Sequence, residues 1–167
     1  MSMLEIDVTD SPIQAERFVG KFGNHQHGAC AFFFGTARNH NLGKRVLSVS
    51  YDAFVPLTKH VFEEICNEAK NKWGFELDIS LIHRIGRLSI GKISVAIGVS
   101  SPHRDESFKA LRYIIEELKV RAPIWKKEIY EYGDESEWIQ GHALCSKSPE
   151  DIGGHTCGRT LAPDGHQ

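Results

Sequence analysis

The stretch "ISVAIGVSSPHRDESFKALRYIIEELK", Ile93 to Lys119, joins the clearest strand pattern in the chain to its clearest helix pattern. Apolar residues alternate from Ile93 to Val99, which indicates a strand with one buried face. Pro123 disfavours helical geometry at the residue before it, so the following helix should end near Lys119 or Val120. The apolar stripe of this helix is expected to consist of Phe108, Leu111, Ile115 and Leu118.

Weaker patterns on both sides predict further helices, strands and a hairpin. Ser11, Pro12 and Gln14 resemble a capping box, and the helix that they begin would end at Gly23. A mixture of helices and hairpin-prone strands indicates an α+β domain. The other expected elements are strands at Gly28–Thr36, Val46–Phe54 and Leu77–Ile85, a loop at Ala37–Arg45, a helix with Val61, Phe62, Ile65 and Ala69 inside that ends near Trp73, a turn at Gly86–Gly91 and a hairpin at Lys127–Gln140.

The composition is that of an ordinary soluble protein with one domain. The chain has 167 residues, of which 41% are hydrophobic and 25% charged, and its formal net charge is -2. This balance provides no general basic field for nucleic acid, so an anion site would be a local cluster. No apolar run is long enough for a membrane span, and the N-terminus does not resemble a signal peptide. The four cysteines form no CxxC pair, which favours reduced thiols and a cytoplasmic location.

The C-terminal segment differs from the rest of the chain. We expect a folded domain over residues 1–144 and a flexible tail over residues 145–167, where glycine, serine and proline are frequent. His142, Cys145, His155 and Cys157 carry metal-binding atoms, but their spacing in a glycine-rich segment favours adventitious binding. Since the chain has neither a zinc motif nor a glycine-rich phosphate loop, we expect no metal and no cofactor.

The junction at Ser101–Asp105 is a first candidate site for an anion. Unpaired N–H groups at a helix N-terminus attract negative charge, and His103 and Arg104 add side-chain donors there. The alternative is that Asp105 caps the helix and that both cations are solvated.

Two polar residues stand out on or after predicted strands. Arg38 follows an apolar strand, where functional side chains are common, but a single arginine at such a place is also often simply exposed. His83 alternates with the apolar residues of its strand, which favours a satisfied core or boundary histidine. Arg84 points the other way, towards the surface or an interface.

The stretch "KVRAPIWKKE", Lys119 to Glu128, places four cations around a rigid apolar centre. Lys119 is favourable at a helix C-terminus because of the helix dipole alone. Lys126 and Glu128 would share one face of an extended strand, and Lys127 would take the other. A lysine near other cations and partly desolvated by Trp125 suits acid–base or nucleophilic chemistry. Alternatively, the apolar residues anchor the segment and the lysines only keep it soluble.

Several stretches together resemble the MoaE family, the large catalytic subunits of molybdopterin synthase. They are "GTARNHNLGKRV" (35–46), "HRIGRLSIGK" (83–92), "SPHRDESFKALRYIIEELK" (101–119) and "VRAPIWKKE" (120–128). The resemblance implies an α/β-hammerhead-like domain with an additional antiparallel sheet. It also implies a sulfurtransferase that moves sulfur from the C-terminal Gly-Gly thiocarboxylate of a small ubiquitin-like subunit to cyclic pyranopterin monophosphate (precursor Z), forming the dithiolene of molybdopterin. Two large subunits would form a homodimer within a heterotetramer.

The same resemblance implies roles for individual residues. Lys119 would lie beside the terminal glycine of the sulfur donor and stabilise the anion that forms there. Lys126 would face the pterin and assist proton transfer or departure of the leaving group. Some relatives carry an arginine after the last tryptophan that reaches the neighbouring subunit, whereas this chain has His142 in that region. Implied substrate-binding residues are Arg38, His103, Arg104 and both lysines, and pocket or partner contacts are Arg121 and Lys127.

Two other functions are compatible with the sequence. A non-catalytic module for phosphorylated ligands or RNA would use its aromatic residues beside cations, although the balanced charge argues against it. An inactive scaffold would keep only the dimer and the partner surface, but both lysines and the His103–Arg104 pair are retained.

Overall fold

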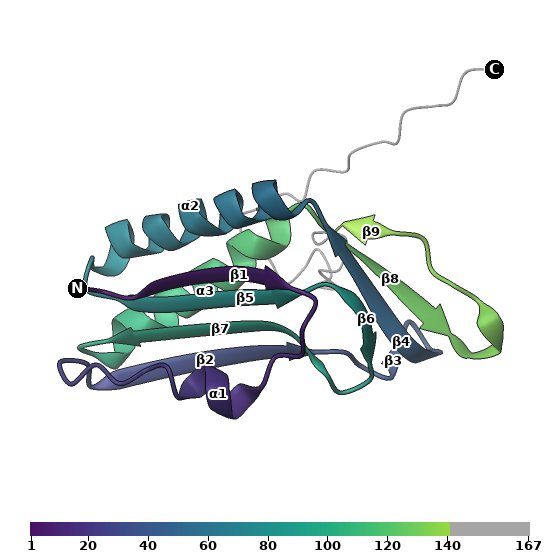
Figure 1. Ribbon diagram of the computed structural model, residues 1–167, viewed down its shortest axis with the longest axis horizontal. Coiled ribbons are helices and arrows are strands. Elements are labelled where there is room, and N and C mark those ends of the chain that lie inside the picture. The colour runs from purple at the N-terminus through teal and green to yellow at the C-terminus, as the bar shows by residue number, and fades with distance from the viewer. Residues whose placement is uncertain (141–167) are drawn as a thin grey trace, which may run out of the picture.

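The computed structural model describes residues 1–140, which form two β-sheets and two long helices (Figure 1). The predicted tail and the histidines and cysteines from His142 onward lie outside the described residues. The α+β class and the additional antiparallel sheet are confirmed. In chain order the elements are β1 Leu4–Thr9, α1 Ala15–Val19, β2 Ala29–Thr36, β3 His40–Asn41, β4 Lys44–Ala53, α2 Val55–Trp73, β5 Asp78–Arg84, β6 Gly86–Ser89, β7 Ile93–Ser101, α3 Arg104–Arg121, β8 Ile124–Tyr130, a 3-10 turn at Glu131–Gly133 and β9 Ile139–Gln140.

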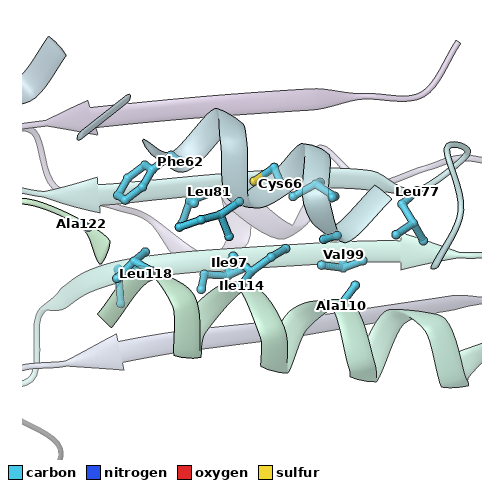
Figure 2. Packing of buried hydrophobic residues seen from close by; sticks show 14 of the residues in the cluster. Phe62, Cys66, Leu77, Leu81, Ile97, Val99, Ala110, Ile114, Leu118 and Ala122 are labelled. Atoms are coloured by element: carbon cyan, nitrogen blue, oxygen red, sulfur yellow. The ribbon is translucent and has the colours of Figure 1, made fainter. Parts of the chain in front are cut away.

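The first sheet has the strand order β1-β5-β7-β2, with β1 parallel to β5 and the other pairs antiparallel. Helices α2 and α3 pack on one face, where their apolar side chains meet those of β5 and β7 (Figures 1 and 2). Burial of this apolar surface is the main source of stability. The fully buried residues in Figure 2 include Phe62, Cys66, Leu77, Leu81, Ile97, Val99, Ala110 and Ile114.

Strand β7 is buried on both faces, although its alternation predicted one. The second face is covered by α1 and the segment after it, with Phe18 only 2% exposed. The predicted cap of this helix is wrong: α1 begins at Ala15, Gln14 makes no side-chain cap hydrogen bond, and Gly20 rather than Gly23 ends the helix. Tertiary contacts of Phe18 with the sheet therefore stabilise a helix that is too short to form alone.

The predicted stripe of α3 is rotated relative to the observed one. Phe108 is 63% exposed, and Leu111 and Ile115 are only partly buried. The line that faces the sheet contains smaller residues, which allow the helix to approach the strands closely. It consists of Ser107, Ala110, Ile114 and Leu118.

The second sheet has the order β3-β4-β8-β9, and β6 pairs with β4. The predicted hairpin is confirmed, since β8 and β9 are antiparallel with Trp125 opposite Gln140. The predicted turn at Gly86–Gly91 is wrong in its first part, because Gly86–Ser89 forms β6. Strand β6 follows β5 after Ile85 alone, so the two sheets meet at this point. No helix in residues 1–140 is both long and apolar enough to span a membrane.

Candidate active site

A small pocket lies where the two sheets meet, and both predicted catalytic lysines line it. Lys119 comes from the last turn of α3 and Lys126 from the start of β8. The cavity has a volume of about 40 Å³, which accommodates a group of a few atoms. Its other walls are Tyr51 of β4, His83 of β5, Ser94 and Val95 of β7, and Leu118, Ala122 and Ile124.

The turn between α3 and β8 sets the separation of the two lysines. Helix α3 ends at Arg121, one or two residues beyond the prediction, because the following proline restricts only Ala122. Ala122 is extended, with φ -72° and ψ 131°. The Pro123 carbonyl accepts a hydrogen bond from the Phe54 N–H at 3.4 Å, which ties the turn to the start of α2.

Lys126 is held by a buried carboxylate. Its Nζ lies 2.6 Å from Oε1 of Glu128, and the side chains are 15% and 7% exposed. Glu128 Oε2 also accepts hydrogen bonds from Asn41 and Tyr130, each at 2.9 Å. Burial raises the pKa of Glu128, but the hydrogen bonds from Lys126, Asn41 and Tyr130 together outweigh it and leave the pKa below its usual value. The predicted shared face of Lys126 and Glu128 is thus confirmed.

His83 is buried, with 4% of its surface exposed, as predicted for a core histidine. Its Nδ1 donates a hydrogen bond to the Arg84 carbonyl at 2.9 Å, and its ring packs edge-on against Tyr51 at 5.1 Å between centroids. Burial, with a smaller contribution from the positive charge of Lys119, lowers the pKa of His83 to about 4. The imidazole is therefore neutral at physiological pH.

The place of His83 and Tyr51 in the pocket wall escaped the prediction from sequence. Strand alternation showed only that His83 faces the core. Its neighbours in the pocket come from β4, α3 and β8, which are distant along the chain. No local sequence pattern carries that information.

Arg38 lies near the pocket but does not line it. It is exposed in the loop between β2 and β3. The neighbouring Ala37 forms two backbone hydrogen bonds with the turn before β7. Its N–H donates to the Lys92 carbonyl at 3.0 Å, and its carbonyl accepts from the Gly91 N–H at 2.8 Å. Arg38 is therefore at the same end of the first sheet as Ser94 and the lysines.

His103 and Arg104 lie at the other end of α3. Arg104 precedes Lys119 by fifteen residues of helix, which corresponds to about 22 Å along the axis. Both residues are exposed, and His103 occupies the N-cap position with no side-chain cap hydrogen bond. Asp105 does not cap the helix, contrary to the alternative above. It lies within the first turn and pairs with Lys109 at 2.7 Å.

Arg121 and Lys127 both lie outside the pocket wall. Arg121 connects α2 and α3, with its Nη1 2.7 Å from Glu68 Oε2. Lys127 is on the opposite face of β8 from Lys126, as predicted, where it pairs with Glu135. The predicted partner contacts of these two cations remain predictions.

The arrangement suits an anionic reactant. Two lysines and a neutral imidazole border a narrow, partly enclosed pocket, so their interaction with a developing negative charge is stronger than in open solution. Within residues 1–140, no group of three or more histidine, cysteine, aspartate or glutamate side chains is placed to hold a metal ion.

The chain is similar to known proteins in sequence and in fold. Residues 8–121 match a family model described as "MoaE protein". A protein of Synechococcus elongatus called molybdopterin synthase catalytic subunit is 43% identical over 143 residues, which make up 86% of each chain. The structure of molybdopterin synthase from Staphylococcus aureus is similar with a TM-score of 0.73 at 37% identity, covering 83% of this chain and 98% of that one. A complex of subunits 1 and 2 of molybdopterin-converting factor from Helicobacter pylori shares the fold, with a TM-score of 0.65, 20% identity and coverage of 81% and 88%.

Proposed function

The chain belongs to the MoaE family, and from this premise we propose that it transfers sulfur from the thiocarboxylate of a small carrier protein to precursor Z. A role in molybdopterin and molybdenum cofactor biosynthesis follows from the family and from its relatives. The observation that carries the proposed chemistry is the convergence of Lys119 and Lys126 on one pocket. Lysines that only keep a segment soluble are expected to be exposed, whereas these two line a pocket between the two sheets.

The size of the pocket favours the sulfur donor, the end of the small carrier protein, over the sulfur acceptor, precursor Z, as its occupant. A cavity of about 40 Å³ admits a group of a few atoms and excludes a pterin ring system. A terminal Gly-Gly has no side chains, so its thiocarboxylate fits a narrow opening. Lys119 would then stabilise the negative charge that develops at the thiocarboxylate carbonyl.

Lys126 is suited to act on precursor Z, because Glu128 fixes the position of its ammonium group. An ammonium held by a buried carboxylate donates its remaining hydrogens in defined directions. We propose that Lys126 stabilises the oxygen that leaves precursor Z when sulfur takes its place, or that Lys126 transfers the proton in this step.

The distance between the lysines and His103–Arg104 favours a site shared by two subunits. One chain does not bring groups about 22 Å apart to a small ligand. The homodimer implied by the family resemblance would supply His103 and Arg104 from a second copy, where they would bind the phosphate. The two-subunit complex from Helicobacter pylori supports a small protein as the further partner.

Reconstitution tests the proposal. The chain, a thiocarboxylated small subunit and precursor Z are combined, and the dithiolene product is measured. Lys119→Ala should lower turnover by about 100-fold or more, the usual effect of losing a group that stabilises an oxyanion. Lys109→Ala is the matched control, because this lysine is exposed on the same helix. Absence of product with the wild type would contradict the proposed function, and normal turnover of Lys119→Ala would contradict the role of that lysine.

A further inference from the structure

We propose that His83 is a positioning residue for the proposed sulfur transfer: its Nε2 accepts a hydrogen bond from the Lys119 ammonium and directs it towards the carbonyl of the bound thiocarboxylate. This inference rests on the proposed function and adds a residue whose role there is not assigned by the family resemblance. It is carried by the tautomer of the histidine and by its place in the pocket wall.

The tautomer of His83 follows from one hydrogen bond. A carbonyl oxygen only accepts, so Nδ1, 2.9 Å from the Arg84 carbonyl, must carry the proton. In a neutral imidazole the other nitrogen, Nε2, then has a free lone pair and acts as an acceptor. Packing against Tyr51 restricts rotation of the ring, so this lone pair has a defined direction.

The partner of Nε2 must be a donor that reaches the pocket. The side chains that line it with His83 and carry a charge or a hydroxyl are Lys119 from α3, Lys126 from β8, Tyr51 from β4 and Ser94 from β7. Lys126 pairs with Glu128, the Ser94 hydroxyl donates to the Gly35 carbonyl, and Tyr51 contacts the imidazole through its ring. The charge of Lys119 acts on His83 itself. The ammonium of Lys119 is therefore the donor that we assign to Nε2.

A neutral acceptor suits the chemistry better than a carboxylate would. It restricts the side chain of Lys119 without adding a negative charge that would oppose the incoming thiocarboxylate. Burial keeps the imidazole uncharged, so it does not repel the ammonium at physiological pH. A misplacement of about 1 Å in such a group costs about a hundredfold in rate.

Two substitutions separate the two ring nitrogens. His83→Asn places an amide N–H where Nδ1 was and keeps the hydrogen bond to Arg84, but it has nothing at the position of Nε2. His83→Gln places an amide oxygen near the position of Nε2 and loses the bond to Arg84. We expect kcat to fall about tenfold or more in His83→Asn and less than about threefold in His83→Gln, with KM for precursor Z within about twofold in both.

The controls distinguish positioning from stability. His60→Asn changes a histidine on α2 that is 65% exposed, and it should leave turnover at the wild-type value. If His83 only anchors the strand end, His83→Asn will have normal kcat and His83→Gln will show the larger loss of kcat and of Tm. That result would overturn the inference.

Nitrogen NMR of the histidine side chains tests the geometry without turnover. At pH 7 the spectrum should show His83 protonated at Nδ1 and not at Nε2, and the opposite tautomer would refute the proposal. In Lys119→Ala the pKa of His83 should rise, because a nearby positive charge is removed, yet stay below its usual value, because burial remains. An unchanged pKa would show that the ammonium is not near the ring.

Failure of this inference is separable from failure of the proposed function. If the wild type forms no dithiolene, the proposed function fails, and the NMR measurements still decide whether His83 holds Lys119. If the wild type is active and His83→Asn is equally active, only the role of His83 is lost.

Discussion

Glu128 shows at the scale of single residues how the fold changes the chemistry of a side chain. It is nearly buried, yet it receives donors from Lys126, Asn41 and Tyr130. A buried carboxylate is tolerated only with such partners. Because one of these partners is a candidate catalytic lysine, the stability of the second sheet and the geometry of the pocket depend on the same group.

Replacement of this carboxylate should therefore reduce stability. Glu128→Gln keeps the size of the side chain but removes its charge, and we expect the free energy of unfolding to fall by about 2 kcal/mol. Urea unfolding at pH 7 measures this change in the free energy of unfolding. Glu131→Gln is the matched control, since Glu131 forms an exposed pair with Arg45 and its loss should cost less than about 1 kcal/mol. Equal effects of the two substitutions would contradict the assigned role.

The stabilisation by Glu128 should also depend on pH. Its pKa is lower in the folded than in the unfolded state, for which the ordinary value is 4.5. The contribution is therefore fully present above pH 4.5 and is lost as the pH falls through the lower folded value. Unfolding free energies measured between pH 7 and pH 3 should decrease more for the wild type than for Glu128→Gln. Parallel curves would show that Glu128 is not the group responsible.

At the scale of elements, α3 connects the core to the site. Its buried line packs on β7 and β2, and its last turn carries Lys119 into the pocket. The helix thus places this lysine through side chains that are themselves remote from the chemistry.

The observed rotation of α3 predicts unequal costs of truncation. Ile114→Ala removes a fully buried side chain and should lower the free energy of unfolding by about 3 kcal/mol. Phe108→Ala removes a larger side chain, but one that is mostly exposed, and should change it by less than about 0.5 kcal/mol in the isolated chain. Chemical denaturation of both variants decides between the observed stripe and the predicted one, which would reverse the order.

On the face of the first sheet that packs against α1 and the segment after it, close packing depends on a glycine. A Cβ added at Gly98 would lie 2.5 Å from Cζ of Phe22, so the ring must move. We expect Gly98→Ala to cost about 1–2 kcal/mol, and less in a Phe22→Ala background, where the nearest obstacle is gone and only Cε1 of Phe18, at 3.1 Å, remains close. Gly23→Ala should have little effect, because no heavy atom lies within 4 Å of an added Cβ. Additive losses in the double mutant would show that Phe22 is not the obstacle.

At the scale of the whole molecule, the proposed shared site requires that Lys119 and Arg104, at the two ends of α3, come from different copies of the chain. Lys119→Ala and Arg104→Ala should each be inactive alone. Mixed in equal amounts and allowed to exchange subunits, they should recover about one quarter of wild-type activity, because half of the dimers are mixed and one site in each is intact. The control mixture of Lys119→Ala with Lys126→Ala should recover nothing, since each of its sites lacks a lysine. No recovery in the first mixture would contradict a shared site.

The sequence by itself determined the elements whose signals are local. Alternation at Ile93–Val99 predicted β7, and Pro123 predicted the end of α3 to within two residues. The shared face of Lys126 and Glu128 followed from the two-residue repeat of an extended strand. These features depend on steric rules and on periodicity within a few neighbouring residues, both of which are visible in the sequence itself.

Only the tertiary structure decided the features that depend on packing between distant segments. The stripe of α3, the pairing of β6 with β4 and the short helix α1 all follow from contacts across the fold. The same holds for the pocket, because His83 and Tyr51 meet the lysines through four elements that are separated in the chain. The physical reason is that burial is a collective property, so a local pattern shows which residues are apolar or charged but not which surface will cover them.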